Sequence, residues 1–187
     1  MIGIPIGLLY ANASEWVAHK YILHGLGKNK KSFWRFHWGD HHKICRKQAG
    51  RDPAYERPLQ GWNPQTKEAL SLAVGVLMHL PVAPLAPFFF GTLAYRAVHY
   101  YRVHRKAHLD PEWAKTHLPW HYDHHMGKDQ DANWCVTHPF FDHLMGTRKP
   151  YLGTEAEARD FKRRERRTTE MRSETVPAND VTVACSA

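Results

Sequence analysis

The sequence predicts an all-α protein: a membrane helical bundle with a helical hairpin, covered by a histidine-rich helical cap on the cytosolic side. Three observations predict this fold. Residues 69–95 carry no charged side chain, and Lys and Arg residues flank them. Histidines recur at helical spacing both before and after this apolar run. The run is interrupted by prolines, which favour a turn between two helices over one continuous helix.

Length and charge limit the possible organisation and partners. The chain of 187 residues predicts one membrane domain, residues 1–153, followed by a charged tail, residues 154–187. In the tail we expect a solvated helix over 155–172 and disorder from 173 onward. The net charge of +8 suits nucleic acid or an anionic membrane surface. Because the basic residues cluster beside apolar segments, we expect a membrane and no nucleic acid.

The N-terminal segment predicts the first helix of the domain. Residues 1–14 are uncharged, and residues 15–24 continue as an amphipathic helix that ends near Gly25 and Gly27. An apolar run of this length suits a buried core helix or a membrane segment, and we favour the membrane. The three cysteines are scattered and form no disulfide framework, so we expect the polar parts to lie in the cytoplasm.

The middle of the chain predicts a loop followed by a hairpin. Residues 28–67 are polar and basic, and residues 52–65 are rich in proline and glycine, as in a loop. The apolar run 69–95 is too long for one span and too short for two, so we expect two helices that turn at Pro81, Pro84 and Pro87, the second running on past residue 96. Basic residues at both ends place both flanks in the cytoplasm. The alternative is a single tilted, kinked span with ends on opposite sides.

The remaining segments follow the hairpin in order. Residues 96–127 are amphipathic and contain the last histidine groups, and residues 128–153 are aromatic and resemble a loop. The histidines at helical spacing form four groups, two on each side of the apolar run. The members of these groups are His19 and His24; His37, His41 and His42; His104 and His108; and His121, His124 and His125.

The spacing within these groups predicts metal binding. Residues four apart share one face of an α-helix, so His37/His41, His104/His108 and His121/His125 can each direct two imidazoles at one centre. The pair His121/His124, three apart, can do the same.

Two spacings differ from this rule. The five-residue step from His19 to His24 requires the helix to end or distort. The adjacent pair His41–His42 points in two directions and can therefore serve two different ions. Ten neutral nitrogen donors suit two ions of about five ligands each, and imidazole binds Fe, Zn and Cu.

The other histidines are assigned weaker roles. We expect His79 to be a hydrogen-bonded core residue, and His138 and His143 to bind no metal. We place His99 and His117, together with Asn133, behind the ligands as supporting groups.

The histidine groups and the segment that follows them resemble those of a known family. The segments EWVAHKYILHG, FHWGDHHK, VHRKAH and WHYDHH, followed by NWCVTHPFFDHLMGT, are similar to those of the fatty acid hydroxylase / sterol desaturase superfamily, over about residues 15–147. The resemblance implies a membrane-bound oxygenase with two metal ions, held by the ten grouped histidines. It further implies iron as the metal, with zinc able to replace it in a purified sample, and O2 as co-substrate.

The departures from the family pattern refine these expectations. Cys135 stands where the family commonly has Gly, and the apolar segment before the first histidine group is short. The three-residue gap between His104 and His108 is that of the acyl 2-hydroxylase branch, which favours a fatty acyl substrate. We expect a separate electron donor resembling cytochrome b5, ferredoxin or rubredoxin. The alternatives are a carotenoid or sterol hydroxylase or desaturase with the same machinery, and a non-catalytic membrane metal-binding protein.

Overall fold

The computed structural model describes residues 1–175, which form helices and no strand. The all-α prediction is confirmed. The chain divides into two compact units, Met1–Leu152 and Gly153–Ala187. In chain order the first unit contains α1 (Gly3–Val17), η1 (Ala18–Leu26), η2 (Phe36–His41), α2 (His42–Lys47), η3 (Pro53–Glu56), α3 (Pro64–Leu77), η4 (Leu80–Val82), α4 (Pro87–Leu109), α5 (Pro111–His117), α6 (Pro119–Met126) and α7 (Phe140–Leu144).

Proline and short polar side chains determine where several of these helices begin. Proline stands in the first turn of α3 and α4, where its fixed φ suits the helix and its missing N–H has no intrahelical partner to lose. The Asn63 side chain caps α3 by accepting a hydrogen bond from the Thr66 N–H at 2.9 Å. Asp110 caps α5 in the same way, accepting from the Trp113 N–H at 3.0 Å.

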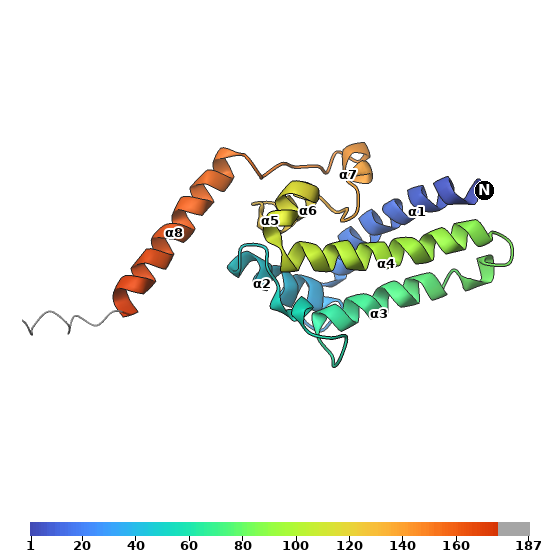
Figure 1. Ribbon diagram of the computed structural model, residues 1–187, viewed down its shortest axis with the longest axis horizontal. Coiled ribbons are helices and arrows are strands. Elements are labelled where there is room, and N and C mark those ends of the chain that lie inside the picture. The colour runs from blue at the N-terminus through green and yellow to red at the C-terminus, as the bar shows by residue number, and fades with distance from the viewer. Residues whose placement is uncertain (176–187) are drawn as a thin grey trace, which may run out of the picture. The chain divides into compact units, whose positions relative to one another are not determined.

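The predicted hairpin is present. α3 and α4 run side by side in opposite directions and are joined by a short proline-rich turn that contains η4 (Figure 1). α4 continues past Arg96 to Leu109, as the sequence predicted, and its second half carries His104 and His108 into the histidine-rich end of the unit. The single kinked span is therefore wrong as a description of this segment.

The predicted membrane-spanning character of the hairpin is not supported. No helix in residues 1–175 is both long enough and apolar enough to pass through a bilayer. With 14 residues, α3 is about 21 Å long, whereas a bilayer core is about 30 Å thick. α4 has 23 residues, but it carries four Lys and Arg residues from Arg96 onward.

α1 lies against α4 over most of its apolar length (Figure 1). Glycines make this approach possible, because a Cβ at Gly7 would come within 2.8 Å of the Thr92 Cβ, and one at Gly3 within 2.8 Å of the Phe89 backbone N. Two glycines four residues apart form one small face on the helix, a pattern typical of closely packed helices. The backbones of α1 and α4 thus pack directly against each other.

The interior is polar at the end of the unit that contains the histidine groups. Aliphatic side chains contribute little to it: one small cluster surrounds Trp16 and Trp134, and another joins Ala107, Ala114 and Leu118. The most deeply buried large side chains are mainly histidines. Because buried polar groups must find partners, this interior depends on how the imidazoles are paired.

The second unit contains α8 (Glu155–Thr175) within its described part. This helix confirms the one predicted over 155–172 and extends it by three residues. Of the segment predicted to be disordered, residues 176–187 lie outside the described part of the chain.

The close approach of α1 and α4 gives a testable prediction. Gly7→Ala places a methyl group against Thr92 and should lower the free energy of unfolding by about 1–3 kcal/mol. Gly91→Ala, on α4, meets nothing within 4 Å and serves as the matched control; it should be neutral or slightly stabilising. Thermal unfolding of the purified variants measures both effects, and equal melting temperatures would contradict this packing.

Candidate metal centre

The first histidine group is carried by an unusual helix. Residues Ala18–Leu26 form a π-helix, in which backbone hydrogen bonds join residues five apart, as from the Gly27 N–H to the Ile22 carbonyl at 3.2 Å. Its wider turn aligns His19 with His24 on one face, which an α-helix would not do. The distortion that the five-residue step required is therefore a change of helix type, which begins at Ala18 and continues past Gly25 to Leu26.

A second π-helix, Phe36–His41, has the same effect on the second histidine group. It aligns His37 with His42, again five residues apart, and their Nε2 atoms lie 3.2 Å from each other. Together with His42, the first residue of α2, and one histidine of α6, the two π-helices form the group that we call the first histidine centre. Its members, whose ligand atoms all lie within 4.8 Å of one another, are His19, His24, His37, His42 and His124.

The second histidine centre lies beside the first and is built mainly from α4 and α6. His104, His108, His121 and His125 have ligand atoms within 4.8 Å of one another. His41 joins them, because its ring lies 4.4 Å from that of His108 and 4.8 Å from that of His125, centroid to centroid. The ten grouped histidines therefore divide five and five.

This division confirms one spacing argument and corrects another. The adjacent residues His41 and His42 serve different centres, as predicted, and His124 and His125 do the same. The prediction that His37 pairs with His41 is wrong, because the π-helix rotates His37 toward His42 instead. The prediction that His121 and His124 share a centre is also wrong, since α6 directs them to opposite centres.

Backbone carbonyls fix the orientation of three of the rings. Nδ1 of His19 lies 2.5 Å from the Trp134 carbonyl. Nδ1 of His124 lies 2.6 Å from the Ala132 carbonyl, and Nδ1 of His108 lies 2.9 Å from the Gly50 carbonyl. A carbonyl can only accept, so Nδ1 carries the proton in each case. Nε2 then carries a lone pair and faces the centre.

Carboxylates fix three further rings. Asp52 lies 2.7 Å from Nδ1 of His41, and Glu68 lies 2.7 Å from Nδ1 of His104. Asp131 lies 3.3 Å from Nδ1 of His24. Pairs of this kind are typical of metal-binding histidines, where the carboxylate orients the ring and makes its other nitrogen a stronger metal ligand.

These carboxylates were missed in the sequence. None of them stands in a histidine group, and each lies in a loop or on another helix, 11 to 107 residues from its partner. The one available signal is that Asp52 and Glu68 flank the proline-rich loop between the second group and the apolar run.

Burial keeps the imidazoles uncharged. It lowers the pKa of nine of the ten, and repulsion between neighbouring imidazolium charges generally adds to the effect. For His124 the pKa falls to about 4, with burial as the main cause. A neutral imidazole is the form that binds a metal.

The geometry fits a metal ion. His104 and His108 both donate from Nδ1 to other acceptors, yet their Nε2 atoms lie 3.1 Å apart. Two lone pairs at this distance repel unless a cation lies between them. Ligands about 2.0–2.1 Å from a zinc-type ion are about 2.9–3.4 Å from each other, which matches the distances here.

Unsatisfied nitrogens indicate the same. His125 is fully buried, and neither of its ring nitrogens has a hydrogen-bond partner. Nδ1 of His121 also lacks a partner, while its Nε2 lies 3.0 Å from that of His108. A buried polar group without a partner costs roughly 1–3 kcal/mol, and an ion in the second centre would remove that cost for the one nitrogen of His125 that binds it.

Two predicted supporting residues lie elsewhere. His99 stacks on Tyr95, and the exposed His117 stacks on Trp113 and bonds its carbonyl. His99 precedes His104 by five residues of regular α-helix, which turns it away from the face that His104 and His108 share. Neither residue contacts a grouped histidine.

Asn133 acts on the ligands through the backbone. It is buried with a φ of +58°, and its side-chain oxygen accepts from the Lys149 N–H at 2.7 Å. It stands between Ala132 and Trp134, whose carbonyls hold His124 and His19. Asn133 therefore supports the first centre without touching a histidine.

The three histidines predicted to bind no metal lie outside both centres. His138 and His143 are exposed. His79 is only half-buried, so the prediction of a core residue is wrong, although its predicted hydrogen bonding is present.

Asp142 organises the segment that follows the last histidine group. Its carboxylate is fully buried and accepts from the backbone N–H groups of Trp134 and Cys135, both at 2.8 Å. Cys135 is buried too, beside Trp16. These bonds hold the Trp134 carbonyl in place behind His19.

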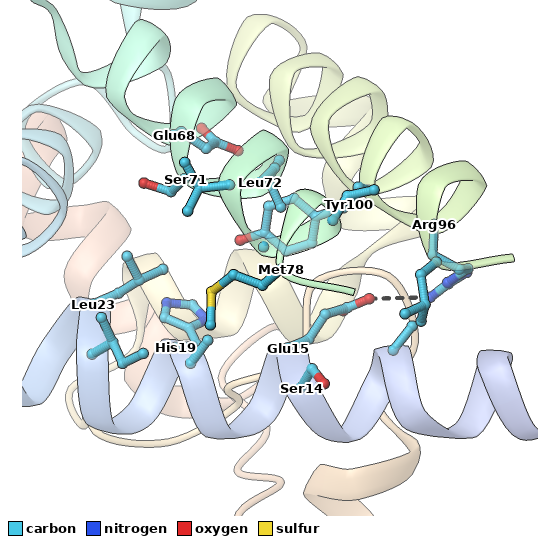
Figure 2. Close-up of a pocket in the computed structure, with 18 of the residues that line it drawn as sticks. Ser14, Glu15, His19, Leu23, Glu68, Ser71, Leu72, Met78, Arg96 and Tyr100 are labelled. Atoms are coloured by element: carbon cyan, nitrogen blue, oxygen red, sulfur yellow. Dashed lines mark hydrogen bonds and ion pairs between the residues drawn. The ribbon is translucent and has the colours of Figure 1, made fainter. Parts of the chain in front are cut away.

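A cavity of about 390 Å³ lies between α1 and α3 (Figure 2). It reaches the first centre from the apolar end of the bundle, the end that holds the start of α1 and the turn between α3 and α4. α1 and α3 line its long sides, and Leu93, Arg96 and Tyr100 of α4 close a third. Its wall is almost entirely carbon. His19 and His37 line its inner end, so the cavity and the first centre share a wall.

The described residues form a helical fold with two buried histidine clusters whose ligand atoms could hold metal ions. A family model described as fatty acid hydroxylase matches residues 4–147, most of the chain. The chain belongs to the fatty acid hydroxylase family, which agrees with the resemblance seen in its histidine groups. No curated protein and no solved structure matches it.

The carboxylate–histidine pairs give a second prediction. Asp52→Asn keeps the shape of the side chain but removes the charge behind His41, and should weaken metal binding about 10- to 100-fold. Asp40→Asn is the matched control: Asp40 is next to His41 in the sequence, but its side chain is half exposed and lies outside both centres. Metal retained after dialysis against a chelator measures the difference. Equal retention by the two variants would show that Asp52 has no such role.

Proposed function

We propose that the protein is an O2-dependent oxygenase that binds two metal ions, iron in the cell, and hydroxylates a lipid, with a fatty acyl chain as the favoured substrate. One observation carries the proposal: the two five-histidine centres lie side by side, and the first forms the inner end of an apolar cavity. A carbon chain in that cavity would end beside the ligands. Two iron ions held there would supply the activation of O2 for attack on a C–H bond.

The chain's own residues supply the surroundings for this chemistry. The carbonyl and carboxylate partners of Nδ1 hold six rings with their lone pairs inward, so the centres need little rearrangement to bind ions. The carbon wall of the cavity keeps water from the reacting carbon. Tyr100 lines the cavity one helical turn before His104 and presents a hydroxyl group within it (Figure 2).

We also propose that the apolar end of the bundle is held in a membrane, with the histidine centres on the cytoplasmic side. Family members are usually membrane-associated. At this end many large apolar side chains are exposed on α1, α3, α4 and the turn between the last two, including Ile2, Ile6, Leu77, Met78 and Leu85. Exposed apolar patches of this extent mark interaction surfaces.

A separate protein would deliver the electrons. Exposed lysines lie on the segment between the two π-helices and at the start of α2, namely Lys28, Lys30, Lys31 and Lys43. Lys28 is linked to the first centre through Asp131, which is bonded to His24. These lysines would attract an acidic redox protein of the ferredoxin, rubredoxin or cytochrome b5 type.

Single histidine variants test the assignment of the ligands. His24→Ala and His108→Ala each remove one donor, from the first and second centre respectively, and metal content and activity should fall together. His138→Ala and His143→Ala are the controls, because both residues are exposed and outside the centres. Metal per protein and product yield are measured for all four. Near-normal metal and activity in both ligand variants would refute the two-centre assignment.

The oxygenase proposal is tested by the product. Lipid extracts from cells with and without the protein are compared by mass spectrometry under 18O-labelled oxygen, and we expect a hydroxylated lipid that carries the label. A product from a sterol or carotenoid instead of an acyl chain would keep the reaction and change the substrate. A protein that binds metal but gives no oxygen-dependent product would be a metal-binding protein without this activity.

A further inference from the structure

The outer end of the cavity is bridged by two polar side chains. The Tyr10 hydroxyl on α1 lies 2.8 Å from Nε2 of His79, which follows α3. Nδ1 of His79 lies 2.8 Å from the Gly75 carbonyl and therefore carries the proton, so Nε2 accepts from Tyr10. Both residues line the cavity and both are partly exposed. This pair marks the mouth of the cavity, opposite the histidine centre.

Apolar residues surround this mouth. Met78 and Leu77 beside His79 are 75% and 61% exposed, and Leu9 beside Tyr10 is 52% exposed. Tyr10 and His79 are therefore two polar side chains within an apolar rim. Tyr10 and His79 bond each other, and an alcohol that inserts between them can accept a hydrogen bond from the Tyr10 hydroxyl and donate one to Nε2 of His79.

The rest of the wall has no free positive charge. Among the lining residues, Arg96 is the one permanent cation, and it is paired with Glu15 at 3.1 Å and bonded to Thr137 (Figure 2). The Arg96 Nε has no hydrogen-bond partner, but it is buried and exposes no surface to the cavity. Glu68, the other lining carboxylate, is bonded to Tyr55 and His104. An ionised carboxylate in this cavity would lie unpaired among carbon atoms, at a high cost.

We propose that the cavity binds a long-chain lipid whose polar end is an uncharged, alcohol-like oxygen, held at Tyr10 and His79 while the hydrocarbon part extends to the first histidine centre. This inference rests on the proposed function and specifies its substrate. His19 follows Tyr10 by nine steps along the helix, about 13 Å at the rise of an α-helix. The carbon next to the histidine centre is then far along the chain from the polar end.

Binding of three ligands of equal chain length tests the proposal: hexadecanol, hexadecanoic acid and hexadecane. Each displaces radiolabelled hexadecanol from the purified, metal-loaded full chain in detergent, without reductant and at a pH well above the pKa of the acid. We expect hexadecanol to bind at least about tenfold more tightly than the acid. Tyr10→Phe and His79→Leu should each weaken hexadecanol binding about fivefold to tenfold, the value of one hydrogen bond, and leave hexadecane binding unchanged.

Tyr95→Phe and His99→Leu are the matched controls, because neither residue lines the cavity and Tyr95 is 62% exposed. Hexadecanoate binding as tight as that of hexadecanol would overturn the proposal. So would an equal loss for hexadecanol and hexadecane in the Tyr10 and His79 variants, which would indicate a structural role for the pair. The binding assay uses no turnover, so a failure of the oxygenase proposal, seen as absent labelled product, is recognised separately.

Discussion

The fold of the first unit depends on a group of inward-facing lone pairs. Ten buried imidazoles meet in two adjacent centres, and wherever Nδ1 is bonded to a carbonyl or carboxylate, Nε2 faces inward without a proton. Nε2 lone pairs about 3 Å apart repel each other, and no side chain in the described part of the interior offsets this repulsion. A cation can offset it, so metal binding and the stability of this end of the bundle are coupled.

The same requirement accounts for the helix types. In a regular α-helix His24 would be rotated well away from His19, and His42 away from His37. Widening both turns to π-helix brings each pair onto one face, and leaves the adjacent His41 free to join the other centre. π-helices are uncommon and concentrate at functional sites, because the geometry must be compensated elsewhere. Here the ligands supply that compensation, so these segments should be the part of the fold most sensitive to metal loss.

Much of this arrangement could be predicted from the sequence, because it follows from local rules. Proline positions located the turn of the hairpin, and histidine spacing identified all ten members of the centres. The assignment of histidines to each centre could not be predicted wholly in this way, since the α-helical rule paired His37 with His41 and could not anticipate a π-helix. The roles of Asp52, Glu68 and Asp131 were not accessible either, because they arise from contacts between segments far apart in the chain. The membrane-spanning interpretation relied on a run of uncharged residues that the structure divides between a short helix, a turn and the start of α4.

One short segment connects the cavity with the metal centre. Residues 132–137 place the Ala132 and Trp134 carbonyls behind His124 and His19, and two residues later the Val136 and Thr137 N–H groups bond the Glu15 carboxylate. Glu15 lines the cavity one helical turn before His19 and is paired with Arg96 of α4. A displacement of this wall by a bound chain would therefore act on the same backbone that orients two ligands of the first centre. Because Asp142 ties that backbone down through two further bonds, such a displacement would be opposed, and the ligands stay oriented while the cavity fills.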